Sequence, residues 1–143
     1  MKLFKNLSAG QKKALLKLPA YISLLASTDL KMDEAEKMSA IKLAHTRSFS
    51  CEPLLADFYR EADRNFEKNI VQLNKELPME MEIREAEVQK EIRNLEKIVL
   101  KLGDDYTLAM QRSLKTFKEH VAKAHHSVIE DFILPITIPG LTD

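Results

Sequence analysis

The chain has 143 residues, a length at which one hydrophobic core normally forms, so two full domains are not expected. Hydrophobic residues make up 45% and charged residues 31%, which excludes a disordered or membrane-like chain. Lys and Arg number 22, as do Asp and Glu, and this balance does not favour nucleic acid as a partner. Three glycines, where about ten would be average, exclude most β-sandwiches, barrels and glycine-cornered nucleotide folds and predict a single all-α domain over residues 1–143.

Two shorter helices are expected in the N-terminal region, residues 1–50. Ser8 and Gln11 have the spacing of a capping box, which opens the first helix, and Pro19 must kink or divide that helix because it removes a main-chain donor. Asp33 and Glu36 form a second capping box, which opens the second helix. The apolar stripe of the first helix consists of Leu15, Leu18, Ile22 and Leu25.

Three long helices are expected over residues 53–132, because apolar residues recur there at steps of three and four. Breaks at Pro78 and at Gly103, the latter a left-handed cap, predict short joins, and short joins favour antiparallel neighbours. The three stripes are Leu55, Tyr59, Ala62, Phe66, Ile70, Leu73 and Leu77; Val88, Ile92, Leu95, Val99 and Leu102; and Met110, Leu114, Phe117, Val121, Ala124, Val128 and Phe132.

The last residues, 133–143, are predicted to form an extended tail. Pro135 and Pro139 end helical structure, and Gly140 permits a turn. The tail either covers the core of its own chain or is an exposed apolar arm that docks on a partner subunit.

Charge is distributed unevenly along the chain. Residues 1–28 contain five lysines and no acidic residue, which is either a solvated helix face or a weak contact with an anionic surface. The single cysteine, Cys51, cannot form an intramolecular disulfide, and the longest charge-free runs, of 11 residues, are too short for a transmembrane segment. A cytoplasmic protein is therefore expected.

Common catalytic and nucleotide motifs do not occur in the sequence, including the phosphate-binding glycine loops, His-Glu-x-x-His and Gly-x-Ser-x-Gly. Three of the four histidines are close in sequence, since His125 and His126 follow His120 by five and six residues. Metal-binding pairs on one helical face are about four residues apart, so this spacing does not favour a metal site. No nucleophile, base and orienting group can be assembled, so the protein is not expected to be an enzyme.

An acidic cluster between the two N-terminal helices is the best candidate for a site. Asp29, Asp33, Glu34 and Glu36 fall within eight residues, where carboxylate oxygens could converge on a hard cation such as Ca²⁺. The spacing is not that of an EF-hand. The alternative is structural, because Asp33 and Glu36 have capping roles and Asp29 suits the turn that ends the first helix.

The same region resembles the TerB-like (tellurite-resistance protein B-like) superfamily. The resemblance lies in Leu15 to Ile22 leading into Ala26-x-x-Asp29-x-x-Met32-Asp33-x-x-Glu36, where Asp29, Asp33 and Glu36 occupy the three acidic places of the family's pattern. It covers about the first 50 residues. The resemblance implies a cytoplasmic bacterial helical bundle of the stress response that acts as a binding module, with the three acids as a divalent-cation site.

Residue 30 departs from the family's pattern, which has glycine at that place. The branched side chain of Leu30 disfavours a left-handed turn, and this argues against tight metal coordination. The leading hypothesis is a helical module that binds a divalent cation and docks a protein partner. The alternative is a structural homo-oligomer, built through the long helices or the tail, with no metal site.

Overall fold

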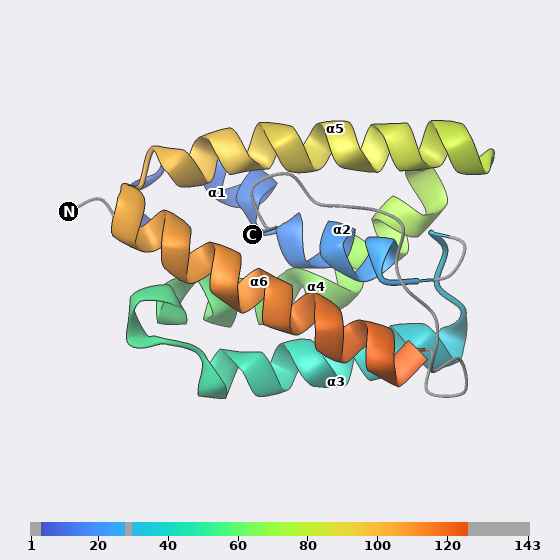
Figure 1. Cartoon of the computed structure of the whole chain (residues 1–143), viewed down its shortest axis with the longest axis horizontal. Helices are drawn as coiled ribbons and strands as arrows, with labels where there is room; N and C mark the ends of the chain where they lie inside the picture. The colour runs from blue at the N-terminus through green and yellow to red at the C-terminus, as the bar shows by residue number, and fades with distance from the viewer. Residues whose placement is uncertain (1–3, 28–29, 126–143) are drawn as a thin grey trace.

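The computed structural model describes residues 4–27 and 30–125. In this part the chain forms α-helices and two short 3₁₀ turns and contains no strand, which confirms the predicted all-α class (Figure 1). The predicted tail, the end of the 53–132 segment and Asp29 lie outside the described residues. The elements are η1 (Phe4–Asn6), α1 (Ala9–Leu15), α2 (Leu18–Leu25), α3 (Glu34–Ser50), η2 (Pro53–Leu55), α4 (Ala56–Glu76), α5 (Met81–Leu100) and α6 (Asp104–His125).

The N-terminal helices begin where the capping boxes predict. The Ser8 hydroxyl accepts a hydrogen bond from the Gln11 main-chain N–H at 3.2 Å, and the Gln11 side chain accepts one from the Ser8 N–H at 3.3 Å. Pro19 stands in the first turn of α2, where a missing N–H costs no helical hydrogen bond, so it divides the predicted first helix into α1 and α2.

Helix α2 is the centre of the fold. Every residue from Leu18 to Leu25 is buried, and the helix contacts α4, α5 and α6 (Figure 1). The two serines in this region are satisfied locally, because Ser23 donates to the Pro19 carbonyl and Ser27 donates to the Ser23 carbonyl. A helix that is apolar on all sides is stable only when other elements cover all its sides. The sequence of α2 is free of charge, and the burial of every residue from Leu18 to Leu25 agrees with this requirement.

Within the described residues, the long helices bury the stripes predicted for them, except that Ala124 is exposed. Val128 and Phe132, the last two positions of the third stripe, lie outside those residues. They alternate in direction, and α6 contacts both α5 and α3 (Figure 1). One detail of the prediction is wrong: α4 and α5 are not packed side by side, because α2 lies between them and contacts both. Gly103, three residues beyond the end of α5, has a positive φ of 100°, as expected of a glycine in the join between α5 and α6.

One aromatic contact and one hydrogen bond join α4 to α6 across the core. Phe66 and Phe117 meet edge to face with ring centroids 6.1 Å apart, and the Tyr59 hydroxyl lies 2.6 Å from that of Ser113. Burial raises the pKa of Tyr59 to about 12, although the hydrogen bond to Ser113 opposes the shift.

None of the helices formed by residues 4–27 and 30–125 has the length and the apolar character that a membrane span needs.

Candidate functional site

The junction between α2 and α3 is built around a left-handed residue. Leu30 has φ of 58°, and it is the one non-glycine residue of the described chain with positive φ. Leu30 therefore adopts the left-handed conformation that its branched side chain disfavours. The side chain is 1% exposed, so its burial in the core compensates the local cost of about 1–2 kcal/mol.

Asn74 of α4 binds the non-helical segment that follows Leu30. Its side-chain oxygen accepts a hydrogen bond from the Met32 N–H at 3.3 Å, and its side-chain nitrogen donates to the Met32 carbonyl at 3.1 Å. One amide side chain thus satisfies both main-chain groups of a residue that belongs to no helix, which is the requirement for burying such a segment.

Arg84 of α5 also binds the junction, through hydrogen bonds from its guanidinium group. Its side chain is fully buried, and its Nε donates to the Leu30 carbonyl at 2.5 Å. The two terminal nitrogens donate to the carbonyls of Leu77 and Pro78, each at 3.2 Å, and to both the carbonyl and the side-chain oxygen of Asn74. These are carbonyls at the end of α4, where a cation is favoured by the helix dipole. The arginine therefore ties the junction to α4 and α5.

Sequence reasoning did not identify Arg84, although a signal was present. The residue precedes Val88 by four positions, so it continues the apolar stripe of α5 by one step toward the N-terminus. A charged residue in register with a buried stripe points to a buried polar network.

Two of the three predicted cation ligands come together at the start of α3. The Asp33 carboxylate accepts from the Glu36 N–H at 2.8 Å, and the Glu36 carboxylate accepts from the Asp33 N–H at 3.0 Å. Glu34 pairs with Lys37 at 2.7 Å instead. Asp29 lies outside the described residues, and among the residues described no group of three His, Cys, Asp or Glu side chains is arranged to hold a metal.

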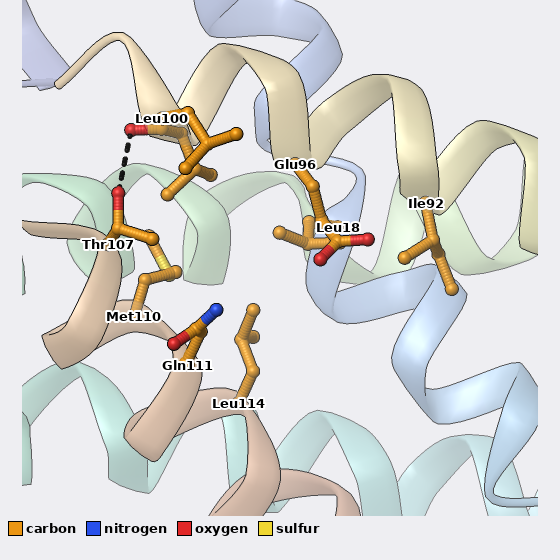
Figure 2. Close-up of a pocket in the computed structure, with 9 residues that line it drawn as sticks. Leu18, Ile92, Glu96, Leu100, Thr107, Met110, Gln111 and Leu114 are labelled. Carbon is orange, nitrogen blue, oxygen red and sulfur yellow. Dashed lines mark hydrogen bonds between the residues drawn. The ribbon is translucent and has the colours of Figure 1, made fainter. Parts of the chain in front are cut away.

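A second feature is an apolar cavity of about 140 Å³ between α5 and α6 (Figure 2). An apolar cavity of that order admits a group the size of a benzene ring. Its base is Leu18 of α2, and its polar groups are few. It is lined by Leu18, Ile92, Glu96, Val99, Leu100, Thr107, Met110, Gln111 and Leu114.

The polar groups of this cavity do not form a catalytic set. Burial raises the pKa of Glu96, and the nearby Arg93 lowers it in part. The Thr107 hydroxyl donates to the carbonyls of Gly103 and Val99, at 2.8 and 3.3 Å, and Figure 2 shows the second of these bonds. Glu96 and Gln111 can therefore position a ligand by hydrogen bonds, but the lining supplies no activated nucleophile.

The described residues thus form an all-α bundle with a buried central helix, an acidic junction between α2 and α3, and an apolar cavity between α5 and α6. Comparison with family models, with curated proteins and with solved structures found no match to this chain.

Proposed function

We propose that the protein is a small cytoplasmic binding module, similar to the TerB-like proteins of bacterial stress response and tellurite resistance, and not an enzyme. The observation that supports this is the backbone at residue 30. The family's pattern has glycine there, and Leu30 adopts the left-handed conformation that such a glycine permits. Residue 30 thus has a backbone conformation that glycine at this place of the pattern permits, although its side chain differs.

In this proposal Asp29, Asp33 and Glu36 bind a divalent cation such as calcium. Capping occupies one oxygen of the Asp33 carboxylate, which has a second oxygen that can accept a metal. The Arg84 guanidinium donates to Leu30, the residue next to Asp29, and its positive charge opposes a cation. We therefore expect weak affinity, with a dissociation constant on the order of 1 mM.

Calcium at about 10 mM should then raise the melting temperature by roughly 3–6 °C, because a ligand tenfold above its dissociation constant adds about 1.4 kcal/mol. Thermal unfolding with calcium or magnesium measures the shift. The informative variant is Asp33→Asn with Glu36→Gln, because Asn and Gln retain the capping box while both charges are lost. We expect this variant to lose the shift.

The matched control is Asp104→Asn with Asp105→Asn, which removes the same charge from the first turn of α6. It should keep the full response to calcium. An equal loss in both variants would mean that the ion acts on overall charge, and no shift in the natural protein would leave the acidic cluster with its capping role alone.

A second candidate function is structural self-association, or docking on a protein partner. It is favoured by exposed apolar side chains at the turn between α4 and α5, where Met79 is 72% exposed and Ile83 is 51% exposed. Methionine adapts to many apolar surfaces and is common where proteins bind one another.

Light scattering at about 0.1 mM protein should then give a mass above the 16.4 kDa of one chain. Met79→Glu with Ile83→Glu should restore the mass of one chain, and deletion of 133–143 tests the contribution of the predicted tail. Met38→Glu, at an exposed methionine of α3, should have no effect. A natural protein that is monomeric at this concentration would contradict self-association.

A further inference from the structure

A polar hollow lies between the end of α1 and the middle of α4. Its volume is about 300 Å³, the lower end of the range for small-molecule sites. Its lining is basic and rich in amides and contains no carboxylate. The residues are Lys13, Leu16, Lys17, Asn65, Lys68, Asn69 and Gln72.

Helical spacing brings the amides of α4 to one side. Asn65, Asn69 and Gln72 follow one another at steps of four and three, beside the buried apolar stripe of the same helix. Asn69 is 7% exposed, and its side-chain nitrogen donates to the Leu16 carbonyl at 3.4 Å. This bond fixes the wall of the hollow where the chain passes from α1 to α2, so the site is largely formed in advance.

Three lysines line the hollow. Lys13 and Lys17 lie four residues apart in the N-terminal basic region, and Lys68 comes from α4. None of the three forms an ion pair with a carboxylate of residues 4–27 and 30–125, whereas Lys37 and Lys90 pair with neighbouring glutamates. Like charges around one cavity repel, and an anion in the hollow would relieve that repulsion.

We propose that this hollow binds the dianionic phosphate group of a phosphomonoester. A phosphomonoester carries a charge of about −1.5 to −2 at pH 7 and has three acceptor oxygens, which match three ammonium donors. Lysine serves as a point charge for phosphate, and the second N–H of each amide can donate to an ester or hydroxyl oxygen. The site is distinct from the acidic junction and does not depend on the cation proposed there.

Isothermal titration of the full chain with inorganic phosphate and with AMP tests the site, at low and constant ionic strength because salt screens such contacts. We expect binding at about 1 mM or tighter, with AMP bound more tightly than phosphate. Lys13→Gln with Lys17→Gln and Lys68→Gln should weaken binding roughly tenfold or more. The matched control, Lys42→Gln with Lys97→Gln and Lys101→Gln, makes the same change in net charge at exposed lysines of other helices and should bind normally.

A parallel arm separates the two sources of such a phosphate. Sedimentation with vesicles containing phosphatidic acid, compared with phosphatidylcholine alone, tests a lipid headgroup. Binding to vesicles that depends on the three lining lysines, and is competed by AMP, assigns the hollow to a headgroup, while binding of AMP alone assigns it to a free phosphomonoester. Equal losses in the lining and control variants, or no binding in either arm at about 10 mM ligand, would overturn the proposal.

Discussion

Replacing Arg84 with methionine should lower the free energy of unfolding by about 3–5 kcal/mol, a large fraction of the stability of a small protein. The guanidinium is fully buried and donates to carbonyls from the junction and from the end of α4. Methionine fills much of the same volume, so the loss comes mainly from the acceptors that are left buried without a donor. Urea unfolding followed by circular dichroism measures it.

The nature of the partners makes this case more severe than that of a buried ion pair. A buried pair can be replaced on both sides by apolar residues at little cost, but main-chain carbonyls cannot be removed. Arg93→Met, at an exposed arginine of the same helix, is the matched control and should change stability by no more than about 0.5 kcal/mol. A loss of stability for Arg84→Met as small as that for Arg93→Met would show that the buried network contributes nothing to stability.

Most helices could be predicted from the sequence because their signals are local. A capping box spans four residues, and the stripes of α4, α5 and α6 repeat within each helix, so neither depends on distant parts of the chain. Pro19 was also informative, since a missing donor at one residue is enough to divide α1 from α2.

The conformation of Leu30 could not be predicted in this way. A leucine in the left-handed region is unfavourable by itself, and what stabilises it lies elsewhere in the chain. The Arg84 side chain that binds its carbonyl is 54 residues away, and Asn74 binds Met32 from 42 residues away. Non-local hydrogen bonds of this kind outweigh local preference, and they leave little trace in residue spacing.

The candidate sites were predictable to different degrees. The pairing of Asp33 with Glu36 follows from the capping box, so the structure brings together the two predicted ligands that are three residues apart. The basic hollow combines Lys13 and Lys17 with Lys68, and only packing places α1 against that part of α4. The excess of lysine near the N-terminus was visible, but its partner residues were not.

The central position of α2 leads to the second large expected effect. Leu24→Ala should lower the free energy of unfolding by about 3–5 kcal/mol, through lost apolar burial and the cavity left behind. Leu24 lies off the predicted stripe of Leu18, Ile22 and Leu25, on the side that a helix packed by one face would expose to solvent. In the structure it is completely buried. Its substitution therefore tests whether α2 is covered on all sides.

The control for this test is Leu108→Ala, because Leu108 of α6 is half exposed and the change in side chain is identical. It should change stability by about 0.5 kcal/mol or less. Leu24→Met, which conserves volume, should cost less than about 1.5 kcal/mol and keeps the comparison possible if the alanine variant does not fold. Similar small losses for both alanine variants would mean that α2 has an exposed face. A large loss at Leu24 alone would mean that α2 is covered on the side opposite its predicted stripe, as its contacts with α4, α5 and α6 indicate.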